Sequence, residues 1–354
     1  MDQKTMKAVV YHGGTDLRIE DVPTPRLEYP NNAIVRVTMS TICGTDVHIV
    51  GGHFPVTLPT VMGHEFVGEV VEIGPDVLDF KVGDRVAVAC VAACGVCEPC
   101  KNGQPVHCTK KNVGCFGLGK ALPGCQTEFV RVPFADNTMY HIPDSLEYED
   151  VLFVGDILST GFFGAESAEI KLGDTVLVVG CGPVGMCAAV SARQFGPAKI
   201  IMVDGVDSRL EIAKREGLCD YTINYTKENV EQRVLELTNG QKADRSIEAI
   251  GKEESMLTCL RNVRPGGNVA ILGVFGGPVK LPMNEQWSNN VTIRCGFVPV
   301  NRIDELIKMI EAGKINMRFL QTHKAPLNDV LRGYDVFGKK KDNVLKWVIT
   351  PWEN

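Results

Sequence analysis

The sequence lacks a long apolar run, a leader-like start and an excess of basic residues. No segment is apolar for long enough to span a bilayer, and residues 1–7 are polar, without the apolar core of a signal peptide. The 37 basic and 43 acidic residues give a net charge of −6, whereas nucleic-acid-binding domains normally carry a basic patch. These absences argue against a membrane span and a nucleic-acid partner, and they predict a cytoplasmic protein.

The chain also has no internal repeats and no low-complexity linker. Its 354 residues are enough for two domains with a buried core, and 44% hydrophobic with 23% charged residues is ordinary for a globular protein. The thirteen cysteines are an odd number, which fits poorly with a fully paired disulfide framework. In a reducing cytosol, clustered cysteines instead indicate a metal site.

The first 150 or so residues are typical of short β-strands broken by glycine and proline. Ala33–Met39 alternates apolar and polar side chains, as a half-buried strand does, and Phe66–Gly74 and Asp84–Val88 are similar. Turn residues at 74–76 and 82–84 separate these segments. This part of the chain therefore predicts a β-rich domain.

The pattern changes near residue 156 to apolar strands that alternate with helices. Short strands that are apolar throughout, with helices between them, favour a parallel, doubly wound sheet of the α/β class. The predicted strands are Thr175–Val179, Lys199–Val203, Arg245–Ile250 and Val269–Val274, and the predicted helices are Pro183–Phe195 and Ser208–Gly217. The tail adds an amphipathic helix at Arg302–Ala312 and a strand at Val344–Thr350.

A glycine-rich turn follows the first strand of this sheet. Gly180, Gly182 and Gly185, with Pro183 and Val184 between the last two, form a G-x-G-x-x-G motif that opens a helix. Glycines allow the backbone to approach a pyrophosphate closely, and the helix N-terminus stabilises its charge. Asp204 ends the next strand, 19 residues after Gly185, where a carboxylate accepts hydrogen bonds from the adenosine ribose and repels the extra phosphate of NADP. The motif predicts NAD(H) binding; the alternative is that Asp204 only caps a turn.

Four cysteines lie within fifteen residues. Cys94, Cys97, Cys100 and Cys108 have the spacing C-x2-C-x2-C-x7-C. Four thiolates at this spacing can close a tetrahedral zinc site that has no open position for substrate. A set of free thiols and a DNA-binding finger are the alternatives, and no basic recognition helix follows to support the finger. The cluster therefore predicts a structural zinc.

Two other segments, Cys43–His48 and Gly63–Glu69, carry polar residues that a strand-rich core does not need. A catalytic zinc takes three protein ligands and keeps one exchangeable position. Cys43 and His64 are suitable zinc ligands. Taken separately, each also has an ordinary explanation, Cys43 as a core thiol and His64 as a hydrogen-bonded core histidine.

These motifs together resemble the zinc-containing medium-chain dehydrogenases, which include alcohol, sorbitol and threonine dehydrogenases. The resemblance covers essentially the whole chain and is carried by 43–48, 63–74, the four-cysteine lobe and the glycine-rich turn. It implies a GroES-like catalytic domain at 1–157 and 298–354, with the structural zinc lobe at 90–110, and a Rossmann domain at 158–297. In this family the active site lies in the cleft between the two domains.

The resemblance also implies the ligands of the catalytic zinc. Cys43 and His64 fall on two of them, and Asp156 falls where many members carry a cysteine. An aspartate at this position resembles the secondary-alcohol and formaldehyde-dehydrogenase-like branches. Glu65 falls on a position that is a ligand in some members, and we expect it to bind zinc when the open position is empty. The alternative for Asp156 is an N-cap of the helix that follows it.

The same comparison implies the remaining roles. Thr45 falls on the hydroxyl that hydrogen-bonds the reacting oxygen, and His48 on the group that passes the proton to solvent. Asp46, in the same segment, is a candidate for orienting a zinc ligand. A surface histidine is the alternative for His48. For the cofactor, Arg209 matches a basic neighbour of the adenosine ribose, and Gly251 is a further predicted contact. Gly44 replaces a basic residue that some members place on the pyrophosphate, which makes Lys346 a candidate for that role.

The expected activity is hydride transfer between NAD(H) and a small alcohol or carbonyl compound. Residues 117–127 resemble formaldehyde-dehydrogenase-like members, whereas 286–301 resemble secondary-alcohol dehydrogenases, so a small secondary alcohol or its ketone is the first expectation and a polyol or threonine the next. We expect a dimer or tetramer that pairs through Val291–Phe297. A non-catalytic NAD-binding relative, a nucleotide sensor and a zinc-finger regulator are the alternatives.

Overall fold

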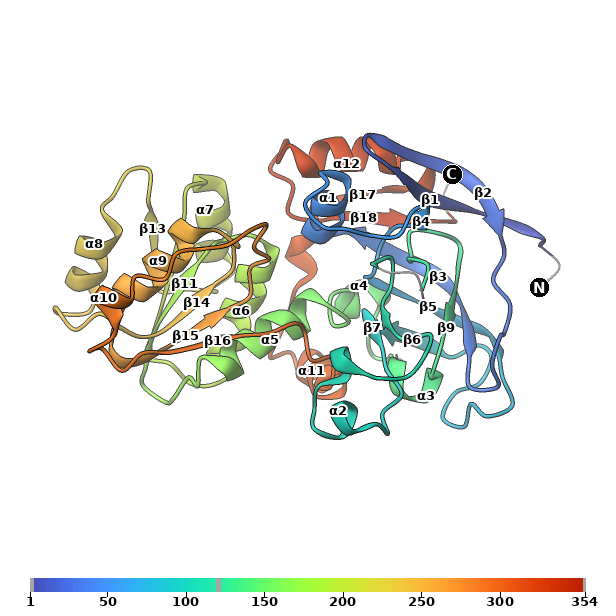
Figure 1. Ribbon diagram of the computed structural model, residues 1–354, viewed down its shortest axis with the longest axis horizontal. Coiled ribbons are helices and arrows are strands. Elements are labelled where there is room, and N and C mark those ends of the chain that lie inside the picture. The colour runs from blue at the N-terminus through green and yellow to red at the C-terminus, as the bar shows by residue number, and fades with distance from the viewer. Residues whose placement is uncertain (1–2, 119–121, 353–354) are drawn as a thin grey trace. The chain divides into compact units, whose positions relative to one another are not determined.

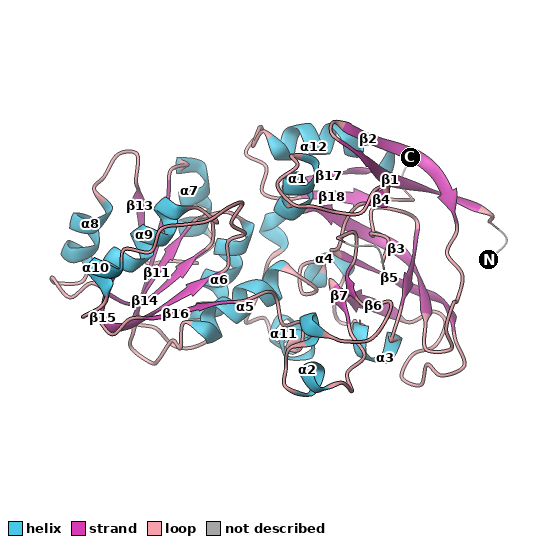
Figure 2. Cartoon of the chain, viewed as in Figure 1, coloured by secondary structure: helices cyan, strands magenta, loops and turns pink. Residues whose placement is uncertain are grey.

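The computed structural model describes residues 3–118 and 122–352. The chain forms two compact units, unit 1 comprising Met1–Ser159 with Pro299–Asn354 and unit 2 comprising Thr160–Val298. The sequence predicts domain boundaries after residues 157 and 297. The boundaries in the structure follow residues 159 and 298, which is two residues and one residue later. Figure 2 shows that strands dominate unit 1 and that helices surround one sheet in unit 2.

Strand β3 (Ala33–Ile42) is central to unit 1. It pairs antiparallel with β5 (Phe66–Ile73), β9 (Phe129–Val132) and β18 (Trp347–Thr350) (Figure 1). Alternate residues Ala33, Val35 and Val37 enter one apolar core, and the strand continues to Ile42, beyond the predicted end at Met39. Because β3 is buried and paired on both sides, the location of the next residue, Cys43, is fixed.

The strands of unit 1 form three sheets, in the orders β2-β1-β4, β10-β6-β5-β3-β18-β17 and β7-β8, and β9 joins the second sheet by pairing with β3. The other strands are β1 (Thr5–Gly13), β2 (Asp16–Pro23), β4 (Thr60–Val61), β6 (Arg85–Val88), β7 (Val91–Ala92), β8 (Gly114–Cys115), β10 (Met139–His141) and β17 (His323–Pro326). The helices are α1 (Gly44–Val50), α2 (Glu98–Lys101), α3 (Ala135–Thr138), α4 (Tyr148–Val151), α11 (Ile303–Glu311) and α12 (Val330–Gly338), with short 3-10 turns at Pro105–His107, Arg318–Leu320 and Leu327–Asp329.

Unit 2 contains one parallel sheet, which confirms the predicted α/β class. Its strand order is β13-β12-β11-β14-β15-β16. The elements are α5 (Ile157–Ser167, which begins in unit 1), β11 (Thr175–Val179), α6 (Pro183–Arg193), β12 (Lys199–Asp204), α7 (Asp207–Arg215), β13 (Tyr221–Asn224), α8 (Val230–Leu237), β14 (Ala243–Glu248), α9 (Glu253–Asn262), β15 (Val263–Ile271), α10 (Met283–Gln286) and β16 (Thr292–Cys295). No helix in the described part of the chain has the length and apolar character needed to cross a membrane.

Two strands begin or end away from their predicted limits for identifiable reasons. The strand predicted to reach Ile250 ends at Glu248, because the Glu248 carboxylate accepts hydrogen bonds from the backbone N–H groups of Ile250 and Gly251. The last strand starts at Trp347 instead of Val344, and the Leu345 N–H donates to the Thr322 hydroxyl instead of to a sheet. In both cases a side chain takes the place of a neighbouring strand.

Replacing Gly185 by alanine should destabilise unit 2. A Cβ at this position would lie 1.9 Å from the carbonyl oxygen of Gly180, so α6 would have to move away from the end of β11. Overpacking of this kind costs about 2 kcal/mol or more in the free energy of unfolding. Urea denaturation without cofactor measures it, and Gly276→Ala, whose Cβ would meet no atom within 4 Å, is the control. Equal stability of the two variants would contradict this reading.

Candidate functional site

The pairing of β3 with β5 brings two distant segments together. Ser40 lies opposite Phe66, and the backbone N–H of Thr41 donates to the carbonyl of Glu65. Cys43 therefore leaves the end of β3 beside His64, which precedes β5. Asp46 fixes the turn into α1, because its Oδ2 accepts the backbone N–H of Cys43 at 2.8 Å.

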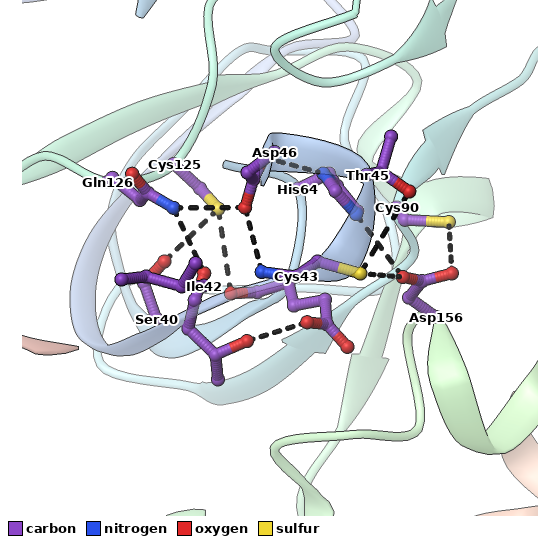
Figure 3. Close-up of polar contacts among 12 residues, drawn as sticks. Ser40, Ile42, Cys43, Thr45, Asp46, His64, Cys90, Cys125, Gln126 and Asp156 are labelled. Carbon is purple, nitrogen blue, oxygen red and sulfur yellow. Dashed lines mark hydrogen bonds and ion pairs between the residues drawn. The ribbon is translucent and has the colours of Figure 1, made fainter. Parts of the chain in front are cut away.

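Three predicted zinc ligands converge at this point (Figure 3). Asp156 Oδ2 lies 3.7 Å from Cys43 Sγ and 3.3 Å from His64 Nε2, and one ligand atom from each of the three residues lies within 4.8 Å of the others. All three side chains are buried. A thiol, an imidazole and a carboxylate that are this close and shielded from water suit zinc, with a fourth position left for substrate.

The Nε2 atom of His64 is directed at the other two predicted zinc ligands. His64 Nδ1 faces Asp46 Oδ1 at 3.5 Å, which leaves Nε2 directed at Cys43 and Asp156. Zinc-binding histidines usually donate the other ring N–H to a carboxylate or carbonyl oxygen, which fixes the tautomer. Burial raises the pKa of the Cys43 thiol, so zinc would have to displace its proton on binding.

The two predicted catalytic residues lie on α1. Thr45 is half-buried, and its Oγ1 is 4.0 Å from Cys43 Sγ, which places it beside the ligand group. His48 lies one turn further along the helix and is not part of that group. Its ring packs edge-on to His53, with the ring centroids 6.1 Å apart. Thr45 is thus adjacent to the ligands, and His48 lies further out.

Glu65 is not brought into the ligand group of the described residues. Its Oε2 accepts the Thr41 hydroxyl at 2.6 Å and forms an ion pair with the Lys346 ammonium. Both side chains of the ion pair are 1% exposed. The expectation that Lys346 reaches a cofactor phosphate is wrong for this structure, because its ammonium is enclosed and already neutralised by Glu65. With this pairing, Glu65 lies outside the group of ligand atoms that Cys43, His64 and Asp156 form.

Cys90 contacts the site and carries no motif that would have predicted it. Its Sγ lies 3.8 Å from Asp156 Oδ1, on the carboxylate oxygen that does not face Cys43 and His64. Cys90 follows β6 by two residues in a run of small apolar residues. From the sequence it is indistinguishable from a core cysteine.

The four lobe cysteines form a second group. The Sγ of Cys97 lies 3.3 Å from that of Cys100 and 3.8 Å from that of Cys108, and one sulfur from each of the four cysteines lies within 4.8 Å of the rest. Hydrogen bonds from the backbone of Thr109 and Cys100 lower the pKa of Cys97 to about 6. These hydrogen bonds favour the thiolate of Cys97, which is the form of cysteine that binds metal. Four sulfurs this close together can fill all four positions of a tetrahedral structural zinc.

In unit 2 the glycine-rich turn has the geometry its sequence predicts for phosphate binding. Gly180 has a φ of +108°, Gly182 caps α6, and Pro183 is the first residue of that helix. Asp204 ends β12 and accepts the backbone N–H of Cys181 at 2.7 Å and that of Val206 at 3.0 Å. These two hydrogen bonds fix the Asp204 carboxylate beside the glycine-rich turn. Val184 and Gly185 belong to the first helical turn of α6.

The other two predicted cofactor residues lie close to this end of the sheet. The Arg209 Nη1 atom is 3.7 Å from where a Cβ on Gly182 would be. Gly251 has a φ of +85°, and a Cβ there would lie 2.3 Å from the carbonyl oxygen of Val274. Glu248, which sequence reasoning missed, accepts the Gly251 N–H and the Ser255 hydroxyl and so fixes this loop.

Comparison with known proteins identifies the family of the chain. Residues 29–144 match the family model described as an alcohol dehydrogenase GroES-like domain, and residues 183–312 match that of a zinc-binding dehydrogenase. An alcohol dehydrogenase of Cupriavidus necator is 37% identical over 98% of this chain and 99% of its own length. The alcohol dehydrogenase TADH from Thermus sp. ATN1 superposes with a TM-score of 0.91, at 36% identity over 98% of this chain and 99% of that one. A proposed zinc-binding dehydrogenase of Sinorhizobium meliloti 1021, solved with NADP bound, superposes with a TM-score of 0.86 at 26% identity, covering 99% of this chain and all of the other.

The chain therefore belongs to the zinc-containing medium-chain dehydrogenase family. It is a zinc-dependent oxidoreductase that acts on alcohols with a nicotinamide cofactor. The predicted family and fold are confirmed.

Removing the charge of Lys346 should destabilise unit 1. In Lys346→Met, Glu65 becomes a buried carboxylate without a cation, which costs about 3–5 kcal/mol in the free energy of unfolding. The double variant Lys346→Met/Glu65→Gln should recover most of this loss, as urea denaturation would show. Lys7→Met, which removes an exposed pair with Asp21, should cost less than about 1 kcal/mol. A double variant no more stable than the single one would refute the pairing as the cause.

Proposed function

We propose that this protein transfers hydride between NAD(H) and a small secondary alcohol or its ketone. The observation that carries the proposal is the buried group of Cys43, His64 and Asp156, whose ligand atoms lie within 4.8 Å of one another. These residues would hold the catalytic zinc, and Cys94, Cys97, Cys100 and Cys108 would hold a structural zinc. When bound, the catalytic zinc lowers the pKa of the substrate hydroxyl and polarises a carbonyl.

The chain's own residues position the substrate and move its proton. Thr45, next to Cys43, would accept the hydrogen bond of the substrate hydroxyl. Burial and the neighbouring His53 lower the pKa of His48, so its imidazole is neutral at pH 7 and able to accept a proton. Thr45 and His48 are three positions apart on α1, and residues with this spacing are neighbours on one face of a helix. We infer that they form the path of the proton from substrate toward solvent.

Asp204 supports a preference for NAD(H) over NADP(H). Two backbone N–H groups hold its carboxylate at the end of β12, so it cannot swing away from an incoming ribose. A fixed negative charge there would repel a 2′-phosphate and accept hydrogen bonds from a free 2′-hydroxyl. The relative from Sinorhizobium meliloti was solved with NADP, so the family allows either choice.

The substrate class rests on sequence resemblance in two segments. Residues 286–301 favour a secondary alcohol, whereas 117–127 favour a formaldehyde-like substrate, and residues 119–121 of that segment lie outside the described part of the chain. A polyol or threonine is the second candidate. The presence of Cys43, His64 and Asp156 together favours an active enzyme over a non-catalytic relative, because all three ligand positions of a catalytic zinc are then filled.

We also propose a cytoplasmic homo-oligomer, a dimer or tetramer, that pairs through β16. All four residues of this edge strand are exposed, and the large apolar side chains of Trp287 and Phe297 flank it, exposed by 75% and 49%. An exposed edge strand with apolar neighbours is an unusual liability in a monomer. A second copy would cover it.

Purified protein should reduce NAD with a secondary alcohol. The test follows NADH absorbance with 2-propanol, 2-butanol, ethanol, sorbitol, threonine and formaldehyde, with parallel wells containing NADP or a zinc chelator. We expect the highest kcat/KM with a secondary alcohol, loss of turnover on chelation and weak turnover with NADP. Bound zinc and NAD without turnover of any alcohol would remove this substrate class and favour a non-catalytic protein.

Asp204→Ala should relax the choice of cofactor. Removing the carboxylate deletes both the ribose contact and the repulsion of a 2′-phosphate, so kcat/KM for NAD should fall and that for NADP should rise. Each change should be about tenfold, or ~1.4 kcal/mol. Asp207→Asn, three residues further along at the exposed start of α7, is the control and should leave the ratio of the two values unchanged. An unchanged ratio in Asp204→Ala would end the assignment.

A further inference from the structure

We propose that Gln126 and Tyr334 are positioning residues for the zinc ligand His64. The Tyr334 hydroxyl fixes the Gln126 amide, the amide fixes the Asp46 carboxylate, and the carboxylate holds the Nδ1 side of the His64 ring. The inference rests on the proposed role of His64 as a zinc ligand. Gln126 lies shortly before β9 and Tyr334 lies on α12. No sequence motif connects either residue with the site.

The Gln126 amide is fully used, and its orientation is fixed by its partners. Its Nε2 donates to the Thr41 carbonyl at 3.1 Å and to Asp46 Oδ2 at 3.2 Å, and its Oε1 accepts the Tyr334 hydroxyl at 2.8 Å. The reversed amide would place its oxygen against two acceptors. Because Gln126 is completely buried, water cannot replace a lost partner. Only one arrangement satisfies all three contacts.

Gln126 is also packed on the backbone that leads into His64. Gly63 has a φ of +94°, and a Cβ there would lie 2.6 Å from the Gln126 Cγ atom. Glycine at this position thus lets the Gln126 stem lie directly against the residue before the ligand. The close contact ties the location of the amide to that of the His64 backbone.

The Asp46 carboxylate transmits this constraint to the imidazole. Its Oδ2 accepts two hydrogen bonds, from the Cys43 N–H at 2.8 Å and from Gln126 (Figure 3). With Oδ2 engaged on both sides, the carboxylate cannot rotate, and Oδ1 stays 3.5 Å from His64 Nδ1. Among the described residues neither of these two atoms makes a hydrogen bond, so each is the nearest polar partner available to the other. Oδ1 is therefore reserved for His64, which selects the tautomer with a proton on Nδ1 and a lone pair on Nε2.

Tyr334 is the outer end of this chain of contacts. It lies on α12, and its ring packs against an apolar core that includes Trp347 and Ile49. The hydroxyl is the polar end of an otherwise apolar side chain, and it points at Gln126. If that hydrogen bond served only to satisfy buried polar atoms, its loss would lower stability alone. If it positions His64, its loss would also weaken the hold on zinc.

Tyr334→Phe removes the hydroxyl and leaves the ring. The measurement is the rate at which zinc passes from the fully loaded protein to a chromogenic chelator. Changing the outer partner of a zinc-bound histidine typically costs 10–100-fold in metal affinity. We expect release of one zinc per chain to be about tenfold faster than in the wild type, with release of the second, from the four cysteines, unchanged. Gln126→Met, close in volume but without hydrogen bonds, should have at least the same effect.

Tyr11→Phe is the matched control. The Tyr11 side chain belongs to the same apolar core as Tyr334. Its hydroxyl donates to the Gly14 carbonyl at 3.3 Å and not to Gln126. Equal zinc release in Tyr334→Phe, Gln126→Met and Tyr11→Phe would overturn the positioning role, even if thermal stability fell. The variant His64→Ala separates this result from failure of the proposed function. If His64→Ala retains both zinc ions, the assignment of His64 is wrong and the positioning role falls with it.

Discussion

The antiparallel pairing of β3 with β5 is the interaction on which the metal site depends. The two strands run in opposite directions, so the end of one lies beside the start of the other, and Cys43 and His64 meet there although 21 positions separate them in the chain. Burial of Val35, Val37 and Val70 fixes the register, because a shift of one residue would turn these side chains to the other face. The position of the ligands is thus a consequence of core packing.

The same region gathers an unusual amount of buried charge. Asp46, Glu65, Asp156 and Lys346 are all removed from water within or next to the ligand group. Each carboxylate has a specific partner: Asp46 the Cys43 N–H and Gln126, Glu65 the ammonium of Lys346, and Asp156 the ring of His64. Buried ion pairs add little net stability, but removing one partner is expensive. The network therefore constrains geometry more than it stabilises the fold.

Sequence alone could predict the parts of the molecule that depend on local pattern. The strand–turn–helix at Gly180 and the clustered cysteines are short-range features, because spacing along the chain determines their geometry. Lys346, Cys90, Gln126 and Tyr334 could not be found this way, since each contacts the site from a segment far away in sequence. The glycine at position 44 makes Lys346 a candidate for the cofactor phosphate, but the sequence does not tell that this lysine is enclosed beside Glu65. The family resemblance supplied Asp156, whose spacing alone carries no metal motif.

The Glu65–Lys346 pair joins an early segment of the chain to a late one. A ribosome delivers the chain from its N-terminus, and domains generally fold as units while synthesis continues. Residues 160–298 are all made before Lys346 emerges, so the nucleotide-binding unit can be complete while Glu65 still lacks its cation. Strand β18 and the residue before it must then insert beside β3. The metal-binding unit therefore matures after the nucleotide-binding unit, and its charge balance is set only once residue 346 has emerged.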